Sequence, residues 1–241
     1  FDRTKEPPAG PKPIVRTPTI WRGTLPSGLQ LSGIEDREVP LVRFEISIDG
    51  GRLFETTARP GVANITARML RRGTAKRTPV ELENALKSLG AEISFSAGDD
   101  RFMLRGQALA RNFPATMALV EEMLLEPRWD VAELALVKAA ATAQIQAQKG
   151  EAQVQAQRVY STVTWPADSI LSKDPLGTVG SVAAITMDDL KAYAAKLAPG
   201  NARMRIVGAT DKADASAALA GLGRRWRRPK VAVPPFPDPT K

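Results

Sequence analysis

The segment from Gly61 to Thr74 constrains the fold more than any other part of this chain. It reads Gly-Val-Ala-Asn-Ile-Thr-Ala-Arg-Met-Leu-Arg-Arg-Gly-Thr. Asn64, Arg68 and Arg71 are spaced four and three residues apart, so they share one face of a helix. Apolar residues recur on another face, namely Val62, Ile65, Met69 and Leu70. The pattern predicts a helix that buries one side and presents polar groups on the other.

Composition excludes several kinds of site. The 241 residues include no histidine and no cysteine, which removes disulfides, thiolates and the two most common zinc-ligand types. Serine catalysis usually needs a histidine base, and the glycines match neither phosphate-binding fingerprint. No apolar run is long enough to span a bilayer. A hydrophobic content of 43% and a charged content of 25% are typical of a globular chain.

The net charge of +8 raises the question of an anionic partner. Basic residues are scattered except in two clusters, Arg68/Arg71/Arg72/Lys76/Arg77 and Arg224/Arg225/Arg227/Arg228/Lys230. Aromatic residues do not interleave with either cluster, so stacking platforms for bases are not evident. A solvated basic surface is therefore favoured, and binding to nucleic acid or to an anionic surface stays open as an alternative.

Proline-rich ends flank a central body. Residues 1–20 and 229–241 each carry five prolines, which resist helix formation and indicate an extended arm or linker. The linker at 229–241 is expected to lead to a following domain that this chain lacks. Residues 21–228 are expected to form a single domain.

Strand and helix patterns mix along the body without regular alternation. Strands are expected at 41–48, 92–97 and 102–108 and helices at 79–89, 114–125, about 131–159 and 187–197, with an irregular connection at 176–184. Capping-box patterns start three of the helices, at Thr78, Asp130 and Thr186. This mixture favours an α+β fold over a doubly wound sheet.

The Gly61–Thr74 segment resembles the zinc helix of the pitrilysin/insulysin metallopeptidases, a family that includes the mitochondrial processing peptidases. There the run reads Gly-(Leu/Val)-Ala-His-x-x-Glu-His-Met-(Leu)-x-x-Gly-Thr, an inverted zinc motif. Asn64 replaces the first histidine, Ala67 the glutamate and Arg68 the second histidine. Further landmarks occur in the family's order, at 24–29, 42–51, 72–78, 89–91, 126–129, 184–190 and 207–211. The resemblance covers about residues 21–236.

The resemblance implies a peptidase half-domain with a mixed, mainly antiparallel sheet and helices packed on one face. Such proteases are built from paired halves, each of two domains, which close around an extended peptide. One domain carries zinc, and its counterpart in the other half or subunit keeps the fold without the metal. We expect this chain to be such a counterpart, with no catalytic residue, no metal ligand and no cofactor.

Two further expectations follow from the resemblance. The family takes a third zinc ligand, a glutamate, from the long helix; here Glu133 is the only acid near its start, and a capping role accounts for it. In the catalytic domain a strand edge pairs with the substrate backbone, and its counterpart here is Ile93, Ser94, Phe95, Ser96 and Ala97. Backbone pairing needs no particular side chains, but an ordinary strand in a hairpin is the favoured explanation of the segment.

The expected function is that of a non-catalytic domain or subunit of a zinc protease of this type. Its partners would be the zinc-bearing half or subunit and, weakly, extended peptides, with no membrane contact; a dimer is left open. Bacterial members of the type suggest the periplasm. The alternatives are a stand-alone interaction module without a proteolytic partner and the nucleic-acid or anionic-surface binder considered above.

Overall fold

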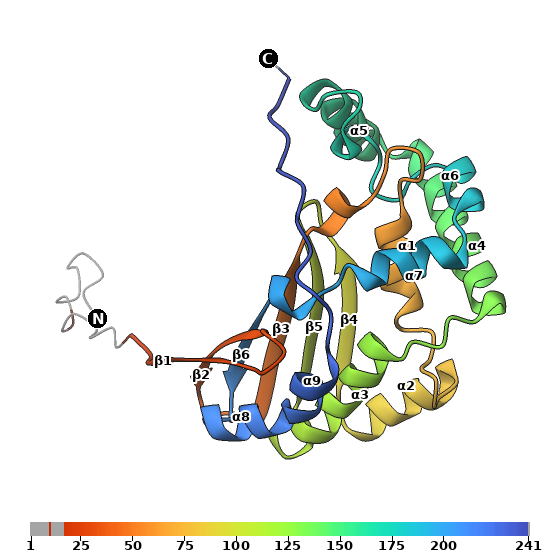
Figure 1. Ribbon diagram of the computed structural model, residues 1–241. Helices are drawn as coiled ribbons and strands as arrows, with labels where there is room; N and C mark the ends of the chain where they lie inside the picture. The colour runs from red at the N-terminus through yellow and green to blue at the C-terminus, as the bar shows by residue number, and fades with distance from the viewer. Residues whose placement is uncertain (1–9, 11–16, 241) are drawn as a thin grey trace, which may run out of the picture.

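A single six-stranded sheet organises the protein, and most of the helices cover one of its faces (Figure 1). The computed structural model describes residue 10 and residues 17–240. The strand order is β1-β2-β6-β3-β5-β4. β2 and β6 run parallel, whereas every other neighbouring pair is antiparallel. The predicted mixed, mainly antiparallel sheet with helices on one face is confirmed.

Alternation of apolar and polar residues gives the sheet one buried and one open face. The strands are β1 Ile20–Thr24, β2 Gln30–Glu35, β3 Leu41–Asp49, β4 Glu92–Ala97, β5 Arg101–Leu109 and β6 Ala202–Gly208. On β3, Val42, Phe44 and Ile46 are buried beneath the helices, while Arg43 on the opposite face is exposed. Within the part of the chain that the structure describes, β4 forms one edge of the sheet and pairs only with β5.

Helices follow β3, β5 and β6 along the chain. Their bounds are α1 Val62–Met69, α2 Pro79–Ser88, α3 Phe113–Leu125, α4 Val131–Ala147, α5 Ala152–Thr164, α6 Val179–Ala184, α7 Met187–Ala195, α8 Lys212–Ala218 and α9 Ala220–Arg225. The capping boxes at Thr78 and Thr186 form as predicted. The Glu81 and Asp189 carboxylates accept hydrogen bonds from the backbone amides of the two cap residues. Within the described residues, no helix has the length and apolarity needed to cross a membrane.

Two predicted elements are wrong. The helix expected to run from about residue 131 to 159 is broken into α4 and α5, because Gly150 and the extended Glu151 interrupt it. The stretch at 176–184 is not wholly irregular, since it contains α6. That helix is capped by Thr178, whose hydroxyl accepts from the Ser181 amide while the Ser181 hydroxyl accepts from the Thr178 amide.

The chain after α9 stays attached to the body. Residues 226–240 form no helix or strand, yet Trp226 is fully buried. The Asn201 side chain donates to the Val231 carbonyl at 2.9 Å and accepts from the Val231 amide at 2.8 Å. Most of the arm predicted at 1–20 lies outside the described residues. The division at residues 20 and 228 stays a prediction.

Candidate functional site: a helix with replaced zinc positions

Helix α1 lies at the centre of the helical layer, in contact with α4, α7 and β4. The predicted apolar stripe is confirmed, because Val62, Ile65, Met69 and Leu70 are all buried. The start of α1 is fixed by Gly61, whose φ of 102° favours glycine. A Cβ at Gly61 would also lie 2.7 Å from the Leu176 carbonyl oxygen.

The Glu55 carboxylate also holds the start of α1. It accepts a 2.6 Å hydrogen bond from the Ala63 amide. Its side chain is fully buried, with the Arg52 guanidinium 3.9 Å away. Burial raises the pKa of Glu55 to about 7, although the Ala63 amide and Arg52 both act to lower it. The helix therefore begins against a carboxyl group that is partly protonated near neutral pH.

Asn64, Ala67 and Arg68 occupy the positions that the resemblance assigns to zinc chemistry. Ala67 is buried, whereas Asn64 and Arg68 are half-buried. The Arg68 Nε donates to the Asn64 Oδ1 at 2.8 Å. One terminal nitrogen of the same guanidinium donates to the Gln144 Oε1 on α4 at 2.5 Å. Arg68 thus connects α1 to α4 through two amide oxygens.

Gln144 has no predicted role, because only carboxylates were expected to matter on the long helix. Glutamine has the shape of glutamate but carries no charge, and that similarity is the signal in the sequence that could have identified it. Its oxygen faces the guanidinium of Arg68 on α1. Gln144 is therefore an α4 residue whose side chain hydrogen-bonds to the helix with the replaced zinc positions.

The donor groups at this point do not fit a zinc ion. Zinc in proteins is held by thiolates, imidazoles and carboxylates, and none of these is present among Asn64, Ala67, Arg68 and Gln144. The two amide oxygens already accept from Arg68. A guanidinium stays protonated in proteins and would repel a dication. No catalytic step through a metal can be derived from these residues.

Glu133 lies elsewhere and does not play the role expected for it. The Asp130 side chain caps α4 by accepting from the Ala132 and Glu133 amides. The reciprocal half of the capping box does not form: the Glu133 carboxylate lies 3.7 Å from Arg72, and its Oε2 makes no hydrogen bond. The capping-box explanation of Glu133 is therefore wrong, because attraction to Arg72 draws the side chain away.

The basic cluster beginning at Arg68 divides into two groups. Lys76 and Arg77 pair with carboxylates at the end of α3, Glu122 and Glu126. The other group faces a cleft of about 650 Å³ between α1, α2, α4 and β4. Four cations line that cleft, and we call them the cleft cations: Arg68, Arg71, Arg72 and Lys87.

Within the described residues, only one carboxylate lines the same cleft. Glu83 lies 3.9 Å from Arg71 and 3.5 Å from Lys87. Arg68 forms no ion pair there, and partial burial together with the charge of Arg72 lowers its pKa. Positive charge therefore exceeds negative charge on the walls of this cleft.

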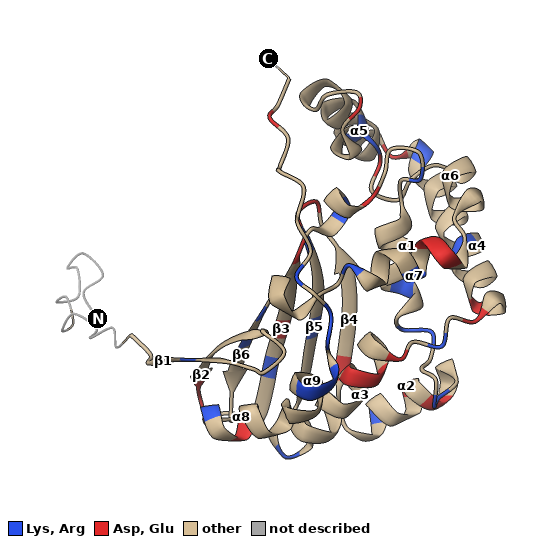
Figure 2. Cartoon of the chain, viewed as in Figure 1, with Lys and Arg blue, Asp and Glu red and all other residues tan. Residues whose placement is uncertain are grey.

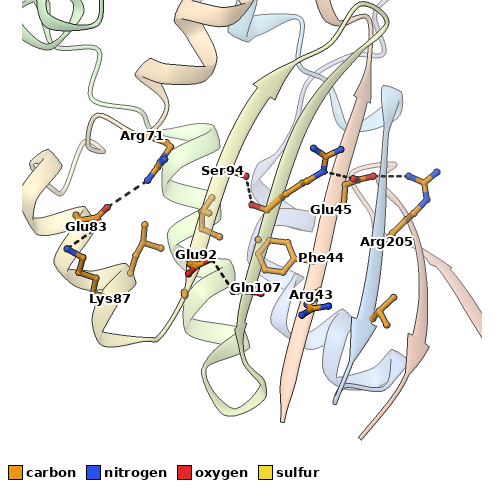
Figure 3. Close-up of a pocket in the computed structure, with 16 residues that line it drawn as sticks. Arg43, Phe44, Glu45, Arg71, Glu83, Lys87, Glu92, Ser94, Gln107 and Arg205 are labelled. Atoms are coloured by element: carbon orange, nitrogen blue, oxygen red, sulfur yellow. Dashed lines mark hydrogen bonds and ion pairs between the residues drawn. The ribbon is translucent and has the colours of Figure 1, made fainter. Parts of the chain in front are cut away.

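A second cleft of about 790 Å³ lies along β4 (Figure 3) and shares lining residues with the first. Both clefts are lined by Arg71, Glu83 and Lys87. β4 contributes Glu92, Ile93 and Ser94 to the second cleft and Phe95 to the first. Together they form one groove that passes between α2 and the edge strand β4 and continues onto the open face of the sheet, and we call it the α2–β4 groove. It places the predicted peptide-pairing segment, residues 93–97, beside the helix that carries the replaced zinc positions.

Two further acidic residues, Asp99 and Asp189, have structural partners. Asp99 receives a hydrogen bond from Arg52 at 2.8 Å, and Asp189 caps α7 and pairs with Arg59. Within the described residues, no three acidic side chains gather as a cation site would require.

The basic residues do not form one continuous surface. Figure 2 shows Lys and Arg distributed over strands, helices and loops, with acidic residues among them. In the cluster near the C-terminus, Arg225 pairs with Glu121 and Glu126. Arg228 donates to the backbone carbonyls of Ala194 and Leu197. This distribution does not favour the nucleic-acid alternative, which needs a basic face.

Comparison with known proteins links these features to peptidases. The sequence model described as insulinase (peptidase family M16) matches residues 34–169. The β subunit of the mitochondrial-processing peptidase of Rattus norvegicus is 21% identical over 195 residues, which is 80% of this chain and 39% of that protein. The chain thus spans about two fifths of the length of the curated relatives it matches.

Solved structures share the fold. A peptidase M16 inactive domain from Pseudomonas fluorescens superposes with a TM-score of 0.84 at 24% identity, covering 91% of this chain and 54% of that one. The first half of the periplasmic protease PqqL from Escherichia coli gives a TM-score of 0.79 at 20% identity, covering 91% and 49%. At these identities the likeness shows the fold, and it agrees with the α+β architecture described above.

Proposed function

The chain belongs to the insulinase family of peptidases, family M16, and on that premise we propose that it is a non-catalytic domain of a zinc peptidase. Its role is to complete the peptide-binding chamber and to support the zinc-bearing half of the enzyme. The observation that carries this proposal is the contact of Arg68 with Asn64 and Gln144. A cation and two amides stand where the family's chemistry needs imidazoles and carboxylates.

What α1 retains also supports a structural role. Its apolar stripe is buried, its first turn is held by Glu55, and its polar face is tied to α4 through Arg68. These contacts stabilise the domain and need no metal. The relative from Pseudomonas fluorescens, described as an inactive domain, has the same fold.

The partner in this proposal is a zinc-bearing half of the same assembly. The chain covers about half of the first half of PqqL, and about two fifths of its curated relatives. Those proportions fit one domain within a larger multi-domain protease. Exposed apolar side chains on α5, namely Val159, Tyr160 and Val163, offer a surface on which such a half could pack.

The peptide-binding part of the proposal rests on the free edge of β4. Every second residue of an edge strand directs its N–H and C=O groups away from the sheet. In β4 that edge borders the α2–β4 groove, so an added peptide strand would lie between β4 and α2. The pairing depends on backbone groups and so survives the loss of every zinc ligand.

A periplasmic location is part of the same proposal. It is supported by the PqqL half, which belongs to a periplasmic protease. Release of the protein by osmotic shock from the organism that makes it would agree with this location, and recovery only after cell lysis would contradict it.

Reconstitution tests the assignment of role. The zinc-bearing polypeptide, identified by a His-x-x-Glu-His segment in the same or an adjacent gene, is purified with and without this chain. Peptide turnover is expected to rise when the chain is added, and the chain alone is expected to hydrolyse nothing. If no such segment exists in either gene, or if the chain fails to change turnover, a stand-alone interaction module becomes the better assignment.

A further inference from the structure

The α2–β4 groove carries a charge pattern that the peptide-binding role alone does not require. Backbone pairing along β4 is indifferent to side chains. Yet four cations line the half of the groove beside α1. Glu133 lies 3.7 Å from one of them, Arg72, and among the described residues the only carboxylate that lines this half is Glu83. That carboxylate is shared between Arg71 and Lys87, both of which remain substantially exposed, at 49% and 71% of the side chain.

The cations on the open face of the sheet are arranged differently. There Glu45 lies between Arg105 and Arg205, at 2.9 and 3.1 Å, in a ladder across three strands (Figure 3). Asp49 accepts from Arg203 at 3.0 Å in a similar way. These arginines already have carboxylate partners. Arg43 also lines the groove on this face and forms no ion pair within the described residues. The larger excess of positive charge lies on the α1 side, where four cations stand against Glu83 and Glu133.

We propose that the α2–β4 groove selects extended peptides that carry acidic side chains, and that the cleft cations receive their carboxylates. The inference rests on the proposed strand addition at β4. Side chains of an added strand alternate between two directions, so acidic residues spaced two apart would all face α1. Arg71 and Lys87, which line both halves of the groove, would meet the peptide first.

Nucleic acid fits the groove less well than a peptide does. Single strands are usually held by aromatic side chains on which bases stack. The aromatic residues that line the groove are Phe44 and Phe95, which belong to β3 and β4. Phe44 is buried in the core and Phe95 is only partly exposed, so neither offers an open stacking platform.

Fluorescence anisotropy on the intact chain tests the inference with three labelled peptides. One alternates Glu with Thr, the second replaces every Glu by Gln, and the third is the Glu peptide with an N-methyl group on every residue. The Glu peptide is expected to bind roughly tenfold tighter than the Gln peptide at low salt, with the difference shrinking as salt is added. N-methylation is expected to abolish binding, because it removes the backbone donors.

Variants locate the effect. Arg71→Gln with Lys87→Gln is expected to remove most of the preference for Glu over Gln, while circular dichroism confirms the fold. Arg224→Gln with Arg227→Gln is the matched control, because both residues are exposed and lie outside the clefts that form the groove. The control is expected to keep the preference.

The possible outcomes distinguish the selection of acidic peptides from the strand addition on which it rests. Equal binding of the Glu and Gln peptides, lost on N-methylation, would overturn acidic selection and leave strand addition standing. Binding of neither peptide would overturn both. A preference for Glu that survives Arg71→Gln with Lys87→Gln would place selection outside the groove, and stronger binding of an oligonucleotide than of the Glu peptide would overturn the assignment of ligand.

Discussion

The guanidinium of Arg68 on α1 donates a 2.5 Å hydrogen bond to the side-chain oxygen of Gln144 on α4, a residue 76 positions later in the chain. The same guanidinium donates a second hydrogen bond, of 2.8 Å, from its Nε to the Asn64 Oδ1. A charged donor therefore joins two helices through neutral acceptors at the point where the family resemblance implies a metal. Three residues make up this arrangement, and the effect of substituting them can be measured.

Arg68→Ala is expected to destabilise the protein. It removes two hydrogen bonds from a charged donor and leaves both amides without their partner, which costs about 1–2 kcal/mol of unfolding free energy. Urea denaturation measures this loss. Arg224→Ala is the control, since Arg224 is exposed on α9 and outside the α1–α4 contact; equal losses in the two variants would show that the Arg68 contacts contribute nothing.

Returning the family's donors should restore zinc binding. The variant with Asn64→His, Ala67→Glu, Arg68→His and Gln144→Glu is expected to bind about one zinc ion per chain, because two imidazoles and a carboxylate complete a protein ligand set. Elemental analysis after dialysis measures the metal. The matched control keeps Gln144 and changes only the three positions on α1.

That control is expected to hold zinc more weakly, since one of the three protein ligands is missing. A folded four-position variant that takes up no zinc would show that α1 and α4 do not bring these positions around one point.

Stability should depend on pH through Glu55. Burial raises the pKa of its carboxyl from 4.5 to about 7 in the folded protein. The protonated form is therefore favoured by folding, so its stabilising contribution is complete below about pH 4.5 and is lost as the pH rises to about 7. Glu55→Gln cannot ionise. Across that interval the wild type should lose roughly 3 kcal/mol of unfolding free energy relative to the variant, at about 1.36 kcal/mol per pKa unit.

Denaturation at several pH values measures the two proteins side by side. A constant difference between them from pH 4.5 to 7 would mean that Glu55 titrates normally, and that its burial is relieved by motion or by water.

Asn201→Ala tests whether the segment after α9 belongs to the domain. Asn201 is buried, and its side chain pairs with both backbone groups of Val231. The substitution is expected to cost about 1–3 kcal/mol because it leaves those groups unsatisfied. Asn84→Ala on the exposed face of α2 is the control. No difference between the variants would favour the predicted linker beginning at residue 229.

Local signals in the sequence predicted most of the fold. The alternation in residues 41–48 and the caps at Thr78 and Thr186 act within a few residues of the elements they define, and each appears as expected. The errors arose where a local signal was weak. Gly150 interrupts a run otherwise rich in helix formers, and Ser181 performs at α6 the capping role that Glu, Gln or Asp usually fills.

The site was predicted less completely than the fold. The assignment of Asn64, Ala67 and Arg68 to the replaced zinc positions follows from their spacing in the motif. The contact with Gln144, in contrast, depends on how α1 packs against α4. Likewise Arg71 and Lys87 lie on different elements, and only the folded chain places both on the walls of one groove. Convergence of distant residues is a property of tertiary packing, which the order of residues along the chain does not display.

The central claim is that the purified chain is not itself a zinc peptidase. Zinc content and hydrolysis of a quenched fluorescent peptide library should be measured together on the same preparation, with a chelator-treated sample as the control for contaminating proteases. We predict no stoichiometric zinc and no turnover above that control. About one tightly held zinc ion per chain, or turnover that follows the protein through purification and disappears with the chelator, would contradict the claim.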